Sequence, residues 1–155
     1  MKQTKVAFIA SSGGHLEQVL RLRPLFEKYD SFLITEKTPY AVSCPCDRHY
    51  TLAQINRHEL LFPLKLIVNA FSAFRIFLKE RPDVVISTGA LAAVPFCLIS
   101  KLLFRKKLIF IESFAKVTSP TITGKLLYRF ADRFYVQWEP MLKVYPKAIY
   151  LGGIY

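Results

Sequence analysis

A histidine and a carboxylate each follow a short apolar run, at positions where side chains do acid–base chemistry. His15 closes the segment Ser11-Ser12-Gly13-Gly14-His15, and Glu112 comes directly after Leu108-Ile109-Phe110-Ile111. An imidazole takes or gives a proton near neutral pH, and a carboxylate at a strand end serves as a general base or orients a hydroxyl. A structural role for Glu112, capping a helix or pairing with Lys116, explains its position equally well. Both side chains are therefore candidate bases.

Two glycine turns accompany these candidates and are suited to a phosphate-bearing ligand. Gly13 and Gly14 follow one strand, and Gly89 ends another. Glycine has no Cβ, so the backbone turns tightly and approaches a ligand closely, although plain turn formation explains the same residues. The first turn is not the dinucleotide pattern G-x-G-x-x-G and is a weak motif alone. The substrate-binding residues expected here are Ser11, Ser12, Gly13, Gly14, Thr88, Gly89, Ser113 and Lys125.

Strands and helices alternate along the chain, which predicts an α/β fold. Short apolar runs without strict alternation indicate strands buried on both faces, as in a parallel sheet with right-handed crossovers. We expect a Rossmann-like doubly wound sheet in a single domain, 1–155, with ligands at the carboxyl ends of the strands. The expected strands are Val6–Ala10, Phe32–Thr35, His49–Leu52, Val84–Ser87, Leu108–Ile111, Arg133–Val136 and Ala148–Leu151; the expected helices are Leu16–Lys28, Pro63–Glu80, Leu91–Phe104 and Thr121–Ala131.

The composition is apolar and strongly basic. Hydrophobic residues make up 52% of the chain, which excludes disorder, and the formal net charge of +11 indicates an anionic partner. Nucleic acid is not expected, because the aromatic residues lie in apolar segments and no nucleic-acid motif is present; a basic nucleic-acid-binding α/β protein is kept as an alternative. Cys44 and Cys46 with a distant Cys97 lack a metal-site pattern, so neither metal nor cofactor is expected.

The segment Pro63–Glu80 predicts a helix with an unusually wide apolar surface. A helix on a sheet needs an apolar stripe of roughly 100°, and this one exceeds it. The segment Ala90–Phe104 is similar and precedes Arg105-Lys106-Lys107, yet neither reaches the about 20 apolar residues of a membrane span. We expect contact with an anionic membrane surface; a tightly packed core with a basic surface is the simpler alternative. The expected membrane residues are Phe71, Phe74, Arg75, Phe77, Lys101 and Arg105.

Five motifs lie in order along the chain: SSGGHL at 11–16, PDVVISTGA at 82–90, IESFAKVTSP at 111–120, GKLLYRFADRFYVQW at 124–138 and YLGG at 150–153. Together they resemble the acceptor-side subunit of split GT-B glycosyltransferases. One branch of that family is the eukaryotic membrane-anchoring subunit of dolichol-linked N-acetylglucosaminyl transfer. Another is the bacterial capsule or exopolysaccharide enhancer of a β-1,4-galactosyl- or glucuronosyltransferase. The layout is also similar to the N-terminal half of the peptidoglycan lipid-intermediate N-acetylglucosaminyltransferase.

The resemblance implies a division of labour between two chains. This chain would hold a polyprenyl-pyrophosphate-linked sugar acceptor, and a separate donor-binding glycosyltransferase subunit would hold the UDP-sugar. Transfer would be inverting and metal-independent, and His15, Glu112 or the partner would deprotonate the acceptor hydroxyl. The opening Met1–Lys5 leads into an apolar strand of about five residues, too short for the core of a signal peptide. We therefore expect no signal peptide and no N-terminal spanning helix, which favours the bacterial branch at the cytoplasmic face of the plasma membrane. A self-sufficient small glycosyltransferase is the alternative, although one Rossmann-like unit offers only half a donor cleft.

Overall fold

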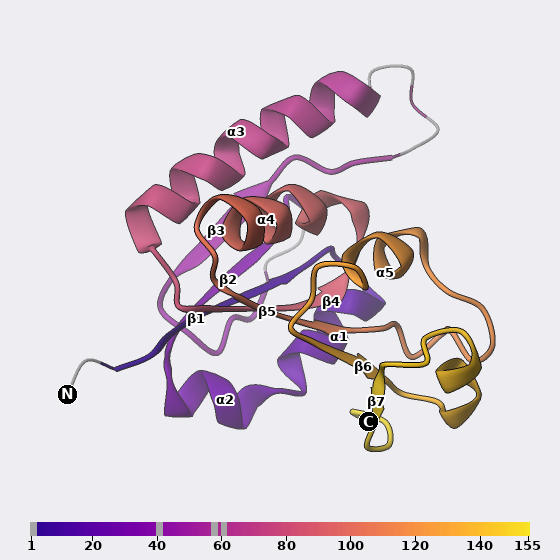
Figure 1. The fold of residues 1–155 in the computed structure, drawn as a ribbon. Coiled ribbons are helices and arrows are strands. Elements are labelled where there is room, and N and C mark those ends of the chain that lie inside the picture. Colours follow the sequence, from indigo (N-terminus) through magenta and orange to yellow (C-terminus); the bar gives the residue numbers. More distant parts are fainter. Residues whose placement is uncertain (1–2, 40–41, 57–58, 60–61) are drawn as a thin grey trace.

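The computed structural model of the chain describes residues 3–39, 42–56, 59 and 62–155. Seven parallel strands form one sheet in the order β3-β2-β1-β4-β5-β6-β7, as Figure 1 shows. The chain builds outward from β1 on one side, then crosses over and continues from β4 on the other. This confirms the predicted Rossmann-like doubly wound fold. The strands are β1 (Lys5–Ala10), β2 (Asp30–Glu36), β3 (His49–Leu52), β4 (Val84–Gly89), β5 (Lys107–Ile111), β6 (Arg133–Val136) and β7 (Ile149–Tyr150).

The predicted strands match the observed ones closely, but two predicted helices are interrupted. The expected helix Leu16–Lys28 is two helices, because Pro24 has no N–H to donate and its ring clashes with the carbonyl four residues earlier. The expected helix Leu91–Phe104 starts as a single turn, continues from Val94 and ends in a wider π-helical turn. The helices are α1 (Gly14–Leu20), α2 (Arg23–Lys28), α3 (Phe62–Glu80), η1 (Leu91–Ala93), α4 (Val94–Leu98), η2 (Ile99–Leu103), α5 (Ile122–Leu127) and η3 (Glu139–Lys143), the last of which was not predicted.

The helices cover the two faces of the sheet unequally. One face lies under α3, α4 and α5, and the other carries α1 and α2 (Figure 1). On the better-covered face, the rings of Phe77 in α3 and Phe104 after η2 stack at 4.0 Å, and Phe96 of α4 lies 6.1 Å from Phe77. On the opposite face Phe8 of β1 stacks on Phe26 of α2 at 3.8 Å. Strands β1 and β4 are neighbours at the point where the order of the strands reverses. Their carboxyl ends are therefore adjacent, and doubly wound folds bind ligands at this point.

Helix α3 turns a polar residue inward and apolar residues outward. Asn69 is completely buried, and its side chain accepts from Ala53 N at 2.8 Å and donates to Ala53 O at 2.7 Å. Asn69 therefore faces the interior and not solvent. The outward residues of α3 that are between 43% and 66% exposed are Leu64, Ile67, Val68, Phe71 and Leu78.

Candidate functional site

The two glycine turns of the sequence lie side by side, because β1 pairs with β4 and Ala10 stands opposite Gly89. His15 and Thr88 connect the turns reciprocally. The Nδ1 of His15 lies 2.8 Å from Thr88 O, and the Thr88 hydroxyl donates to His15 O at 2.7 Å. A carbonyl only accepts, so in the neutral imidazole Nδ1 carries the hydrogen and Nε2 keeps its lone pair. The hydrogen bond to Thr88 thereby leaves Nε2 as the ring atom of His15 that can accept a proton.

Gly89 is required for this arrangement. Its φ is +117°, a conformation that side chains with a Cβ rarely adopt. A Cβ added there would lie 3.0 Å from Cε1 and 3.1 Å from Nδ1 of His15. Gly13 also has a positive φ, +74°, but a Cβ there would meet open space. The second glycine turn thus makes room for the imidazole.

A hollow of about 430 Å³ opens beside His15. It is bounded by the start of α1, by the loop after β5 and by the last residue, Tyr155. Of the expected substrate-binding residues, Ser113 lines the hollow. Thr88 is completely buried behind His15, and Ser11 is 7% exposed. Lys125 is exposed on α5 and does not line the hollow. The lining residues are Gly14, His15, Gln18, Ser113, Phe114, Ala115 and Tyr155.

Glu112 is buried and fully hydrogen-bonded. Only 1% exposed, it accepts at Oε1 from Ser113 N at 2.9 Å and from the Thr121 hydroxyl at 2.8 Å. Its Oε2 accepts from Thr121 N at 3.2 Å and from the Tyr145 hydroxyl at 2.8 Å. These bonds leave no lone pair directed at a substrate, so the geometry fits the structural alternative, in which Glu112 secures the start of α5. Sequence spacing gave no signal for Tyr145.

Tyr145 stays a hydrogen-bond donor to this carboxylate. Burial raises the pKa of its phenol, and the neighbouring negative charge of Glu112 and the hydrogen bond to it raise the pKa further. A phenol that resists ionisation keeps its proton for Glu112. The Thr121 hydroxyl in turn accepts from Gly124 N at 2.8 Å and caps α5. The carboxylate therefore organises a cluster of donors.

The expected membrane residues separate into exposed and internal ones. Phe77 is 1% exposed and stacks on Phe104, so it belongs to the core and the expectation that it touches a membrane is wrong. Phe74 is half-buried beside the same ring at 6.2 Å. Lys101 pairs with Asp132 at 2.5 Å. The exposed members are Phe71, Arg75 and Arg105.

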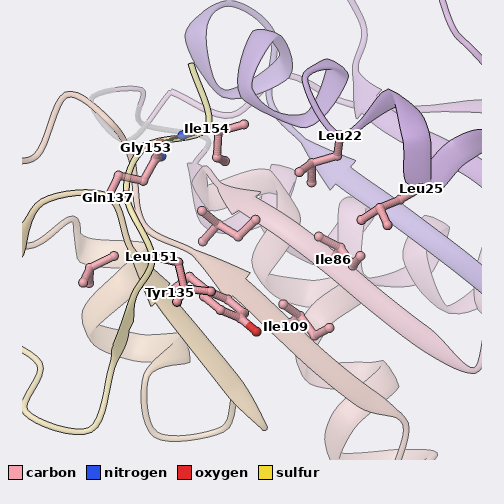
Figure 2. Close-up of a pocket in the computed structure, with 12 residues that line it drawn as sticks. Leu22, Leu25, Ile86, Ile109, Tyr135, Gln137, Leu151, Gly153 and Ile154 are labelled. Carbon is pink, nitrogen blue, oxygen red and sulfur yellow. Dashed lines mark hydrogen bonds between the residues drawn. The ribbon is translucent and has the colours of Figure 1, made fainter.

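A second hollow, of about 350 Å³, lies on the sheet face that α1 and α2 cover incompletely. Figure 2 shows Leu22 and Leu25 on one side, with Ile86, Ile109 and Tyr135 rising from the strands. None of the expected substrate-binding or catalytic residues lines it. Its walls are mainly apolar, and none of the candidate bases lies in it.

The cysteines show no arrangement typical of a metal site. Cys44 and Cys46 lie side by side with their sulfur atoms 2.8 Å apart, and burial together with the neighbouring Cys44 raises the pKa of the Cys46 thiol to about 12. Cys97 is completely buried, and burial raises its pKa to about 12 as well. Across the described ranges, no three His, Cys, Asp or Glu side chains are grouped as metal ligands. High pKa values keep thiols protonated and unreactive.

Comparison with known proteins gives a family match over most of the chain. Residues 51–154 match the family described as "Oligosaccharide biosynthesis protein Alg14 like". The human UDP-N-acetylglucosamine transferase subunit ALG14 is 34% identical over 177 residues, covering 96% of this chain and 82% of that protein. The UDP-N-acetylglucosamine--N-acetylmuramyl-(pentapeptide) pyrophosphoryl-undecaprenol N-acetylglucosamine transferase of Nitrosospira multiformis is 31% identical over 97 residues, covering 63% of this chain and 26% of that protein.

Solved structures share the fold at low identity. Acinetobacter baumannii MurG matches with a TM-score of 0.69 and 19% identity, covering 88% of this chain and 42% of that chain. UDP-N-acetylglucosamine 2-epimerase from Rickettsia bellii matches with a TM-score of 0.75 and 14% identity, covering 99% of this chain and 46% of that chain. The chain spans less than half of either protein, and the likeness shows the fold alone. The family match and the human relative establish that this chain belongs to the Alg14-like family of oligosaccharide biosynthesis proteins.

Proposed function

We propose that the chain is the acceptor-side subunit of a two-chain, UDP-sugar-dependent glycosyltransferase and is inactive alone. It would hold a polyprenyl-pyrophosphate-linked sugar, while a separate donor-binding subunit holds the UDP-sugar. The observation that carries the proposal is His15, which Thr88 orients beside a hollow at the carboxyl edge of β1 and β4. The names of the human and other relatives as transferase subunits support the two-chain arrangement.

His15 would act as the general base of this reaction. Its Nε2 accepts the proton of the acceptor hydroxyl, whose oxygen bonds to the anomeric carbon as the bond from that carbon to UDP breaks, with inversion. The proton ends on the imidazole, and Thr88 O stabilises the resulting cation through the Nδ1–H bond. Glu112 then has a structural part, because its oxygens are occupied.

The acceptor pyrophosphate would lie against the first glycine turn. Gly13 and Gly14 are exposed and Ser12 is half-buried, so their backbone amides remain within reach of a ligand. Ser113 closes the hollow from the loop after β5. Lys125 is exposed elsewhere on α5, so its role as a phosphate contact requires an acceptor that extends beyond the hollow.

The proposed identity of the transferred sugar comes from the names of the relatives and not from the sequence motifs. The human, mouse and rat proteins are named UDP-N-acetylglucosamine transferase subunits. These names favour N-acetylglucosamine over the galactosyl or glucuronosyl transfer implied by the bacterial branch of the resemblance. The capsule or exopolysaccharide setting and the bacterial plasma membrane depend on the sequence argument alone.

The outward surface of α3 would lie on an anionic membrane. Ile67 and Phe71 are 66% and 65% exposed, and Leu103 at the end of η2 is 66% exposed. Exposed apolar side chains gathered in this way mark an interaction surface, and the exposed Arg75 and Arg105 add positive charge suited to anionic headgroups. Among the helices described, none has the length and apolarity to cross a membrane.

Transfer by a reconstituted pair tests the catalytic proposal. The chain is co-expressed with a candidate donor-binding glycosyltransferase and assayed with UDP-N-acetylglucosamine, UDP-galactose or UDP-glucuronate and a polyprenyl-pyrophosphate-linked sugar. We expect transfer only with both chains, and a loss on the order of 10²–10⁴-fold in His15→Ala without loss of partner binding. His49→Ala, which removes an exposed imidazole on β3, is the matched control. Transfer by this chain alone, or full activity of His15→Ala, contradicts the proposal.

Flotation with vesicles tests the membrane surface separately. Vesicles of phosphatidylcholine with anionic phosphatidylglycerol should carry the wild-type chain, and the double substitution Ile67→Ser and Phe71→Ser should leave it in the unbound fraction. Leu151→Ser changes an apolar residue that is 81% exposed, outside α3 and η2, and should still float. Equal flotation of the double variant and the wild type would remove α3 from the contact.

A further inference from the structure

Gln18 is a buried amide that joins the two loops on either side of the His15 hollow. It is 3% exposed. Its Nε2 donates to Gly14 O at 3.1 Å, and its Oε1 accepts from Phe114 N at 3.1 Å and from Gln137 Nε2 at 2.7 Å. Gly14 belongs to the glycine turn, Phe114 to the loop after β5, and Gln137 follows β6. One side chain therefore connects three segments that are remote in sequence.

The hydrogen bonds around Gln18 define which way its amide points. Gln137 Nε2 also donates to Glu112 O at 2.9 Å, and Gln137 Oε1 accepts from Ile154 N at 3.0 Å. The nitrogen of Gln137 therefore faces Gln18, which must present its oxygen in return. That oxygen also meets Phe114 N, and the nitrogen of Gln18 is left for Gly14 O. Each connection uses a donor and an acceptor in the correct sense.

We propose that Gln18 is a positioning residue for the proposed transfer reaction. It holds the loop of Ser113 and Phe114 at a defined separation from the turn that carries His15. An acceptor bound between these loops then presents its hydroxyl to Nε2. Both polar atoms of Gln18 are engaged with protein groups, so it acts through the loops. This inference rests on the proposed function for its catalytic consequence, but the coupling of the loops does not.

The protein contains its own reporter of this coupling. Trp138 is the single tryptophan, its Nε1 donates to Phe114 O at 2.6 Å, and the two rings lie 4.9 Å apart. Gln18 holds the backbone nitrogen of the same Phe114. A shift of the Phe114 loop therefore changes the surroundings of the indole, and its fluorescence detects the shift without any turnover.

Two substitutions of Gln18 remove different sets of its hydrogen bonds. Gln18→Met keeps a similar length and loses all three hydrogen bonds. Gln18→Glu keeps oxygens that accept from Phe114 N and Gln137 Nε2, but turns a carboxylate oxygen toward Gly14 O. We expect the Trp138 emission to shift to the red and to become more accessible to acrylamide in Gln18→Met, and to remain close to wild type in Gln18→Glu. If Gln18→Met fails to fold, Gln18→Glu still tests the kinetic part, because it should be impaired through the Gly14 bond alone.

The kinetic expectation is a loss in turnover. With the partner subunit and saturating acceptor, kcat should fall about 10- to 100-fold in Gln18→Met, because displacement of reacting groups by about 1 Å costs that much. Gln18→Glu should lie between it and the wild type, with partner binding retained in both. Asn69→Leu removes a buried amide that bonds Ala53 instead, and it should lower stability without moving either the emission or kcat.

The outcomes distinguish this inference from the function on which it rests. The positioning role is overturned if both Gln18 variants keep the wild-type kcat. It is also overturned if Asn69→Leu, at an equal loss of stability, shows the same loss of kcat. Unchanged Trp138 emission in a folded Gln18→Met overturns the coupling of the loops. If the wild-type pair transfers no sugar while Gln18→Met still shifts the emission, the proposed function fails and the coupling stands.

Discussion

Replacing Glu112 by glutamine should destabilise the fold without removing a catalytic base. Each carboxylate oxygen accepts one backbone N–H, from Ser113 or from Thr121, and one hydroxyl. Hydroxyls rotate to suit a new neighbour, but a backbone N–H does not. Whichever way the amide introduced by Glu112→Gln is placed, its NH₂ faces one of the two N–H groups. One buried donor then loses its partner.

The size of the effect follows from that lost partner. An unsatisfied buried donor costs about 1–3 kcal/mol, and hydrogen bonds to a charged acceptor are stronger than those to a neutral one. Together these losses predict that Glu112→Gln lowers the free energy of unfolding by about 2–4 kcal/mol. For a chain of 155 residues, this corresponds to a fall in Tm of roughly 5–15 °C.

Urea unfolding followed by circular dichroism measures the difference directly. The unfolding midpoint of Glu112→Gln should fall with little change in slope, since the surface exposed on unfolding is unchanged. Tyr145→Phe removes a single hydroxyl from the same carboxylate and should cost about 1.5–3 kcal/mol. Transfer by the folded variant with its partner should stay within about tenfold of wild type, far above the loss expected for removing a general base. Wild-type stability combined with abolished transfer would refute this reasoning and return Glu112 to the chemistry.

Two further predictions concern stability. A Cβ at Gly124 would lie 2.0 Å from the buried Glu112 carboxylate, so Gly124→Ala should lower the free energy of unfolding by at least about 2–3 kcal/mol, measured by thermal unfolding. The control is Gly14→Ala, because a Cβ at Gly14 meets nothing within 4 Å. Equal losses of stability in the two variants would contradict the packing argument. Burial alone would raise the pKa of Glu80, but hydrogen bonds and the charges of Lys5 and Arg48 outweigh it and hold the pKa below its ordinary value of 4.5. A carboxylate with a lowered pKa stabilises the fold above its unfolded pKa and loses that contribution as the pH falls through its folded pKa. The stability of the wild type should therefore decline below pH 4.5, as measured by urea midpoints at a series of pH values. The stability of Glu80→Gln should decline less steeply. Identical pH profiles would show that the ionisation of Glu80 does not contribute to the pH dependence of stability.

Sequence patterns were sufficient for the strands. Short apolar runs depend on local side-chain preferences, so the ends of the strands were predicted to within two residues. Parallel strands bring their carboxyl ends to one edge, so the turns at Gly14 and Gly89 were both expected at that edge, and the pairing of β1 with β4 makes them neighbours. Helix interruptions were harder, since Pro24 lies inside an otherwise periodic segment and periodicity outweighed it in the prediction.

Roles that depend on partners distant in the chain could not be predicted. Whether Glu112 has a free lone pair is decided by Thr121 and Tyr145, nine and 33 residues later. Gln18 stands one turn after Gly14, and that spacing was the available signal for its bond to the glycine turn; its bond to Phe114 spans 96 residues. No local pattern encodes such pairs.

Local periodicity and composition were enough to establish the fold class and the wide apolar surface of α3. Long-range packing settled which phenylalanines face outward: Phe77 packs in the core, while Phe71 remains exposed. It also settled that His15 keeps a free ring nitrogen and Glu112 has no free oxygen lone pair. A side chain's chemistry depends on which donors and acceptors surround it, and packing brings those together from across the chain.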